Sequence, residues 1–245
     1  MRASTMRSTI SSLGLLAAMT LAAAAQDDSR VTLETAIREQ GDASNVQDLY
    51  LRVRFKSFKE GSEGTKTEAE GFLREFYRPP QLFRVEVEAD DGSGDIETAK
   101  VYDGVTGKGL YARINAATVH KGDHALDAES LERLRDQVRP LRFLLLDQFL
   151  REGAQLATPK RVKPGTRKVE WREDEKSKES LALQFEEFRL TKVSVTRSDG
   201  GQDYIVELSG HRRFGEKQLL FPTVATVFRK NGEGKLEKVL ERQVV

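Results

Sequence analysis

Few residues of this 245-residue sequence have the types and spacing that catalysis or metal binding requires. The sequence contains no cysteine, which excludes a thiol nucleophile, a thiolate metal site and a lipid anchor on cysteine. His120 and His124 have the spacing of two metal ligands on a helix, but Gly122 lies between them and such a pair needs a rigid helix. His211 precedes two arginines, which is more typical of a loop or strand end than of a general base. We therefore expect no metal site.

Two short segments are similar to phosphate-binding or catalytic motifs but lack the spacing that defines them. Residues 104–109 are rich in glycine and include Lys108, yet the Walker spacing and the terminal Ser or Thr are missing, so we expect a turn. Ser93 lies between two glycines without the outer spacing of a nucleophile elbow. The 39 acidic residues make any single carboxylate pair uninformative. We therefore expect a protein that is not an enzyme, with no catalytic residue and no cofactor.

Composition narrows the class of protein further. Lys and Arg total 40 against 39 Asp and Glu, so the formal net charge is +1. Proteins that bind nucleic acid usually carry a strong basic excess or a basic stripe. The sequence is 38% hydrophobic and 32% charged, which is enough to build a core beneath a polar surface. We therefore expect no nucleic-acid partner.

Residues 1–25 have the three parts of a secretory signal peptide. Arg2 and Arg7 form a positive start, residues 13–21 form an apolar stretch, and small alanines precede a polar segment. The apolar stretch is shorter than the roughly 20 residues that a membrane-spanning helix needs. We therefore expect export to the periplasm, with cleavage after Ala25.

The remaining chain, residues 26–245, mostly alternates between apolar and polar residues with the period of β-strands. Turn sequences rich in Gly, Asn and Asp separate these segments, which predicts roughly ten or eleven strands joined mainly by hairpins. A short helix is expected over residues 29–41, where Gly41 ends it. No segment is long enough to link two domains. We expect a single domain whose strands form one large antiparallel sheet.

A sheet with this many strands is expected to curl, which gives it one concave, apolar face. The strand residues expected on that face are Leu49, Leu51, Val53, Phe55, Phe83, Val85 and Val87. Whether this face is filled by side chains or encloses a cavity depends on the segment that covers it.

Residues 127–150 break the strand pattern, with apolar residues at steps of three and four. Pro140 should split or kink this helical segment because it cannot continue the hydrogen-bond ladder. The part after Pro140 is apolar on more than one side, so it is either a core helix packed on the sheet or a lid over a hydrophobic cavity. As a lid, it would face the cavity with Val138, Leu141, Leu145 and Phe149.

Several segments together resemble a known family. They are residues 70–79 (EGFLREFYRP), 82–85 (LFRV), 101–106 (VYDGVT) and 220–223 (LFPT). In this order they resemble the periplasmic lipoprotein carrier family and its outer-membrane lipoprotein-sorting relatives (LolA-like proteins). The resemblance covers residues 30–150 in sequence and the last third only in the order of elements. The chain departs from the family by the doubled proline Pro79-Pro80 and by its greater length after residue 150.

This resemblance implies an unclosed antiparallel half-barrel, covered by a helical lid, with lipoprotein acyl chains or lipid held in an apolar cavity. It implies a monomeric chaperone that receives cargo from an inner-membrane donor and passes it to an outer-membrane acceptor. In the family, the arginine before the proline of the Arg-Pro turn holds the lid closed through hydrogen bonds to lid backbone, and the matching residue here is Arg78. The alternative is an envelope interaction or sensing module with the same fold and a filled core.

Overall fold

The computed structural model describes residues 28–245 except 42, 44–45, 47, 62–63, 79–81, 89–95, 104–105, 115–117, 151, 158–165 and 217. For residues 60–61, 64–65, 96, 110–114 and 118–124 it describes the backbone alone. The predicted signal peptide, the pair Pro79-Pro80 and Ser93 therefore lie outside the described residues, as do the side chains of His120 and His124.

Within the described part of the chain, thirteen strands form one sheet in the order β6-β5-β4-β3-β2-β1-β15-β14-β11-β10-β9-β8-β7, and neighbouring strands are antiparallel. The strands of this sheet are β1 (Leu49–Gly61), β2 (Gly64–Arg78), β3 (Leu82–Glu88), β4 (Ile96–Tyr102), β5 (Gly107–Ile114), β6 (Thr118–Ala125), β7 (Gln155–Ala157), β8 (Thr166–Arg172), β9 (Glu179–Glu186), β10 (Arg189–Arg197), β11 (Tyr204–Ser209), β14 (Val224–Lys230) and β15 (Leu236–Val244). The remaining elements are α2 (Ala128–Val138), the 3-10 turns η1 (Leu141–Phe143) and η2 (Leu146–Leu150), and a separate hairpin of β12 (Arg212–Phe214) and β13 (Leu219–Phe221).

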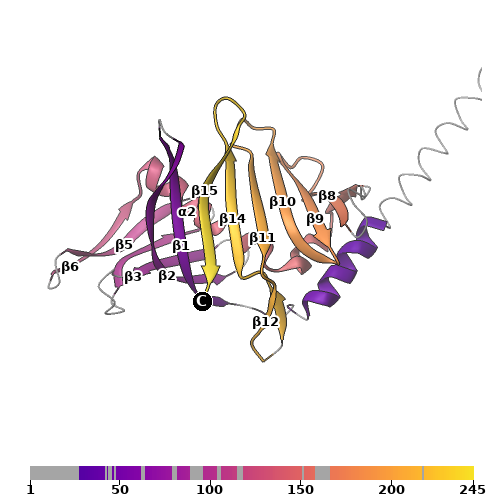
Figure 1. The fold of residues 1–245 in the computed structure, drawn as a ribbon, viewed down its shortest axis with the longest axis horizontal. Helices are drawn as coiled ribbons and strands as arrows, with labels where there is room; N and C mark the ends of the chain where they lie inside the picture. Colours follow the sequence, from indigo (N-terminus) through magenta and orange to yellow (C-terminus); the bar gives the residue numbers. More distant parts are fainter. Residues whose placement is uncertain are drawn as a thin grey trace, which may run out of the picture.

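The sheet is curled and unclosed (Figure 1). β6 and β7 form its two edges, and the first strand, β1, pairs with the last strand, β15, near its middle. This confirms the predicted fold class, a mainly β protein built on one large, curved antiparallel sheet with a short N-terminal helix.

Strand alternation decides which face of the sheet each side chain takes. β1 pairs with β2 so that Leu49 lies opposite Tyr77 and Val53 opposite Leu73, and β3 continues the same row with Phe83 opposite Tyr77. Of these residues all but the half-buried Leu49 are buried, and they form the concave face. Because successive side chains of a strand point to opposite faces, the residues between them lie on the outer face.

Residues 127–150 follow β6 and precede β7 in the chain, and they cross the concave face of the sheet. We call them the lid segment. α2 begins after Asp127, whose carboxylate accepts a hydrogen bond from the backbone N–H of Ser130 at 2.7 Å. Pro140 ends this helical stretch, as predicted. After Pro140 the chain forms the two 3-10 turns and no second α-helix, because its apolar residues pack against the sheet in several directions.

The helices are short. The N-terminal helix spans residues 28–40, and Gly41 ends it with a φ of +101°, close to the predicted bounds. The side-chain amide of Gln40 donates to the carbonyl of Leu144 and accepts a hydrogen bond from the backbone N–H of Leu146 at 2.9 Å. This helix therefore ties the lid segment to the β8–β9 end of the sheet (Figure 1). No helix among the described residues has the length and apolar character needed to cross a bilayer.

In the described part of the chain, two apolar clusters form the core. One is centred on β8–β11 and β14, and it includes the N-terminal helix together with Phe143 and Phe149 of the lid segment. The other joins β2 and β3 to Leu134, Leu141 and Leu145 of the lid segment. The lid segment thus packs into both clusters, and most of its apolar residues are core residues.

Candidate ligand-binding site

Among the residues that the structure describes, three cavities lie beside the lid segment or at the ends of β1–β5. The helix cavity, of about 590 Å³, lies between α2 and strands β1–β4, β14 and β15. The hairpin cavity, of about 390 Å³, lies between β1, β15, the chain around Pro140 and the β12–β13 hairpin. The edge cavity, of about 690 Å³, lies at the ends of β1–β5. All three have the volume of ordinary small-molecule sites, which is roughly 300–1,000 Å³.

The hairpin cavity has mainly apolar walls. Its apolar lining consists of Val46, Leu49, Leu51, Pro140, Leu144, Phe214, Leu219, Phe221, Pro222, Ala225 and Val244. The charged side chains on its wall are those of Asp48, which is exposed, and Arg242, which is buried. The cavity is therefore suited to a largely apolar ligand.

Arg242 on β15 forms an ion pair with Glu75 on β2, across β1. The two side chains are only 5% and 1% exposed. Burial raises the pKa of Glu75 to about 7, although the charge of Arg242 opposes this shift. Burial also lowers the pKa of Arg242, against the opposing charge of Glu75. Because two charges taken out of water recover their hydration energy only partly through mutual attraction, this pair is an unusual component of an apolar face.

The helix cavity combines apolar and charged side chains. Phe55 and Val87 line it from the sheet, whereas Glu132 and Asp136 of α2 and Arg229 of β14 add charge. Burial raises the pKa of Asp136 to about 6, although neighbouring arginines oppose this shift. The Nε atom of Arg229 is buried with no hydrogen-bond partner among the described atoms, 3.6 Å from Asp136 Oδ2.

The edge cavity is lined by side chains from both faces of the sheet. Tyr50 and Phe76 lie on that face with ring centroids 4.9 Å apart, and the guanidinium of Arg84 lies 5.7 Å from the Phe76 ring. Leu82 on the same face is half exposed. From the concave face, Leu49, Tyr77 and Phe83 also line this cavity, and no residue of the lid segment does.

The eleven residues predicted to line one apolar cavity fall into two groups. Those that line at least one of the three cavities are Leu49, Leu51, Phe55, Phe83 and Val87. Those that are buried and line none of these three are Val53, Val85, Val138, Leu141, Leu145 and Phe149. The helix and hairpin cavities thus lie at the margins of the lid segment, and the space beneath its centre is packed.

Arg78, expected from the family resemblance to hold the lid, makes a different contact. Its Nε and Nη2 atoms donate to the two carboxylate oxygens of Asp48 at 2.7 and 3.0 Å. Both side chains are more than half exposed. No hydrogen bond from Arg78 to the lid segment is among the contacts described. The Arg78–Asp48 pair instead joins the end of β2 to the start of β1.

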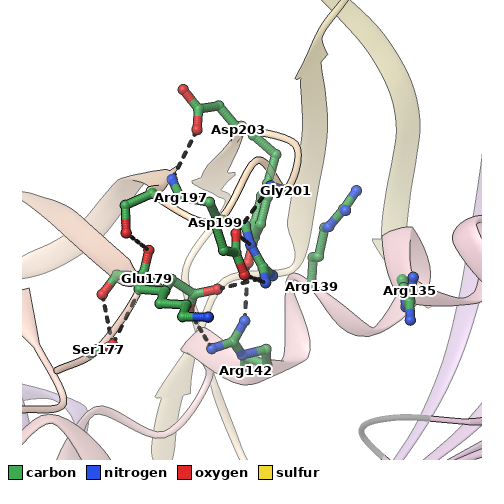
Figure 2. Close-up of polar contacts among 12 residues, drawn as sticks. Arg135, Arg139, Arg142, Ser177, Glu179, Arg197, Asp199, Gly201 and Asp203 are labelled. Atoms are coloured by element: carbon green, nitrogen blue, oxygen red, sulfur yellow. Dashed lines mark hydrogen bonds and ion pairs between the residues drawn. The ribbon is translucent and has the colours of Figure 1, made fainter.

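Arg139 and Arg142 hold the lid segment to the sheet. Arg142 donates to Glu179 Oε1 at 2.7 Å, which Figure 2 shows, and to the hydroxyl of Tyr204 at 3.1 Å. The guanidinium of Arg139 lies 4.3 Å from the centroid of the Tyr204 ring and forms an ion pair with Asp136. These contacts tie the middle of the lid segment to the first residues of β9 and β11.

Sequence reasoning missed the buried pair Glu75–Arg242, although the pattern contained a signal. Glu75 is at an inward position of β2, two residues from Leu73 and from Tyr77, and Arg242 is at the equivalent inward position of β15 after Leu240. A charged residue in the apolar row of a strand is rare unless it is paired. Two such residues indicate a buried pair or a site.

These features define a class of protein, a curled, unclosed antiparallel sheet with a lid segment across its concave face and cavities beside that segment. No family model matches the sequence, and no curated protein matches it significantly. The LolA superfamily protein of Nitrosomonas europaea is a similar solved structure, 12% identical over 89% of this chain and 91% of that one, with a TM-score of 0.47.

Two further solved structures are similar. An outer membrane lipoprotein-sorting protein domain of Vibrio parahaemolyticus is 9% identical over 86% of this chain and 88% of that one, with a TM-score of 0.48. A DUF1329 family protein of Desulfovibrio piger is 10% identical over 88% of this chain and 90% of that one, with a TM-score of 0.49. The first two of the three structures bear the names of the families that the sequence resembles.

Proposed function

We propose that this protein is a non-catalytic periplasmic carrier or binder of lipoproteins or other amphiphiles, whose acyl chains occupy the cavities beside the lid segment. The observation that carries the proposal is the hairpin cavity, about 390 Å³ of mainly apolar-walled space between the lid segment and the concave face. Protein interiors are close-packed, so apolar space of this size next to a core is suited to an apolar ligand.

The energetics fit reversible binding of an acyl chain. Each methylene that leaves water contributes about 0.8 kcal/mol, so a few methylenes are enough for binding without specific contacts. Release needs movement of the segment above the cavity. Opening the lid segment breaks the bonds of Arg142 to Glu179 and Tyr204, which water can replace.

The proposal also covers location and partners. The signal-peptide pattern supports export to the periplasm with cleavage after Ala25. We propose that the mature residues 26–245 are a single domain, and the family resemblance supports a monomer. The family resemblance of residues 70–79, 82–85 and 101–106 supports an inner-membrane donor and an outer-membrane acceptor of the cargo. The transfer requires no chemistry on the cargo.

Uptake of a fluorescent fatty-acid probe by delipidated protein tests the proposal. Leu51→Trp places a large ring in the hairpin cavity, and we expect it to weaken probe binding about tenfold or more, the equivalent of nearly two methylene groups. Leu236→Trp, at an exposed position on β15 away from the cavities, is the matched control. Equal probe binding by both variants, or no uptake by the wild-type protein, contradicts the proposal.

A second function is favoured by the packed part of the concave face. Leu73 and Val85 of the sheet pack against Leu141 in the middle of the lid segment, as expected of an envelope interaction or sensing module with a filled core. This alternative predicts no lipid in native mass spectra of the protein purified from the envelope, and capture of a partner protein. An acyl species bound in those spectra favours the carrier.

A further inference from the structure

Arg242 is a buried cation at the wall of an otherwise mostly apolar cavity. The register of β15 places it opposite Phe55 of β1 and Ala225 of β14, on the concave face. It lines the hairpin cavity together with Leu51 and Leu144, although only 5% of its side chain is exposed. A buried charge in this position is costly unless it is paired and hydrogen-bonded.

The guanidinium of Arg242 has more N–H donors than the hydrogen bonds described for it. Its Nη2 atom donates to Glu75, and this is the only hydrogen bond of Arg242 among the contacts that the structure describes. A guanidinium carries five N–H donors in a planar fork. Asp48, the other charged residue on the cavity wall, is exposed and already bound by Arg78. Arg242 is therefore the positive group available to a ligand in this cavity.

We infer that the hairpin cavity binds a single-chain amphiphile with a carboxylate head, whose chain lies against Leu51 and Leu144 and whose carboxylate pairs with Arg242. This inference rests on the proposed function and names the ligand class of that cavity. Arginine and carboxylate form strong, often bidentate hydrogen bonds, and apolar surroundings strengthen them. A neutral head leaves the arginine donors unmatched, and a cationic head meets a like charge.

Glu75 allows a second carboxylate to approach Arg242. Two carboxylates that share a site favour retention of one proton between them. Burial already raises the pKa of Glu75 to about 7, so Glu75 accepts the proton of a ligand that enters as the neutral acid, and the total charge of the site is unchanged. The lid segment and the β12–β13 hairpin contribute uncharged residues to the cavity, and Leu51 and Val85 flank Glu75 in register. Besides Arg242, the charged residue on the cavity wall is Asp48, which is exposed and bound by Arg78.

Titration calorimetry of the full chain tests the inference, with dodecanoate and dodecyltrimethylammonium below their micelle concentrations and dodecanol below its solubility limit. The wild-type protein is expected to bind dodecanoate about ten- to a hundredfold more tightly than the other two, the range of hydrogen bonds to a charged group. Glu75→Gln leaves Arg242 without its counter-ion and is expected to strengthen dodecanoate binding further, with dodecanol binding unchanged.

Arg242→Met alone leaves a buried carboxylate unpaired, so the double variant Glu75→Leu/Arg242→Met is used to remove both charges together. We expect it to bind dodecanol as the wild type does and to lose the preference for dodecanoate. Arg54→Met, on the exposed outer face of β1, is the matched control and keeps the preference.

The failures of the two proposals are distinguishable. Equal binding of dodecanoate and dodecanol by the wild type, or an unchanged preference in the double variant, overturns the carboxylate site and leaves the carrier function standing. Binding of none of the three amphiphiles overturns both proposals.

Discussion

The two halves of the sheet differ in what covers their concave faces. Over β8–β11, the rings of Phe149 and Trp171 meet edge-on with centroids 5.3 Å apart, and the Trp171 indole donates to the Phe149 carbonyl at 2.9 Å. None of the three cavities is lined by residues of β8–β11. Over β1–β5, the same lid segment leaves space at its margins. The half that contains β8–β11, which we call the support, is packed. The half that contains β1–β5, which we call the cavity half, carries the cavities.

Two leucine truncations, one in each half of the sheet, test whether the two halves differ in packing. Leu183→Ala in the fully buried support should lower the free energy of unfolding by about 4 kcal/mol, because it leaves a new hole in a packed core. Leu51→Ala enlarges a cavity that already exists and should cost about 1 kcal/mol. Urea unfolding measures both values. Equal losses would mean that the two halves are packed alike.

Removing one partner of the buried Glu75–Arg242 pair should lower the free energy of unfolding, whereas replacing both partners with apolar residues should not. Arg242→Met should lower the free energy of unfolding by about 3 kcal/mol, since it leaves the Glu75 carboxylate buried and unpaired. Glu75→Leu/Arg242→Met should restore most of that loss, because neither charge is then buried. Denaturant titration of the two variants decides this, and a double variant as unstable as the single one argues against it.

The pH dependence of stability should follow the same pair. Burial raises the pKa of Glu75 from 4.5 to about 7 in the folded state, so between these pH values the folded protein binds more protons than the unfolded chain. The free energy of unfolding should therefore fall as pH rises from about 4.5 to 7. Asp136, whose pKa is raised to about 6 by burial, acts in the same direction. Unfolding at pH 5 and pH 8 should show a smaller fall in Glu75→Gln than in the wild type, and identical falls would refute the assignment.

Loosening the lid segment should affect one region and spare the other. Arg142→Met removes the bonds to Glu179 and Tyr204 and should lower the free energy of unfolding by about 1 kcal/mol, because the Arg142 side chain is 39% exposed. Hydrogen exchange should become faster in residues 139–150 and stay unchanged in β8–β11. Arg172→Met, at an exposed position, serves as the control. Unchanged exchange in the lid segment would show that apolar packing alone holds it.

Arg78→Ala should have the smallest effect. Its partner Asp48 is exposed, and exposed ion pairs contribute little to stability. We expect no measurable shift in the unfolding midpoint and no change in the hydrogen exchange of residues 139–150. Faster exchange there, comparable to that of Arg142→Met, would restore the role in holding the lid that the family resemblance implies.

The helices and strands could be predicted from local sequence rules more readily than the ligand-binding site could. Strand alternation and the break at Pro140 depend on neighbouring residues, and the structure confirms both. The cavities depend on residues that are far apart in the sequence. Leu51 and Val53 share one face of β1, yet Leu51 lines a cavity and Val53 is fully buried, since the covering segment lies far along the chain.

The contacts that hold the lid segment were equally hard to predict. Arg142 lies 37 residues from Glu179 and 62 from Tyr204, and no periodicity in the sequence connects them. Arg78 was predicted from a short Arg-Pro resemblance, which carries no information on where the side chain points. The described contact with Asp48 was decided by the register of β1 and β2.

Site-resolved quenching tests most directly whether apolar ligands enter the cavity half and not the support. Trp171 is the single tryptophan and reports on the support, whereas Phe221→Trp in a Trp171→Phe background places an indole at the hairpin cavity. Bromododecanoic acid quenches the fluorescence of an indole that it contacts. We predict quenching of the indole introduced at position 221 and none of Trp171 in the wild type. Quenching of Trp171 without quenching at position 221 would contradict the division of the molecule into a support and a cavity half.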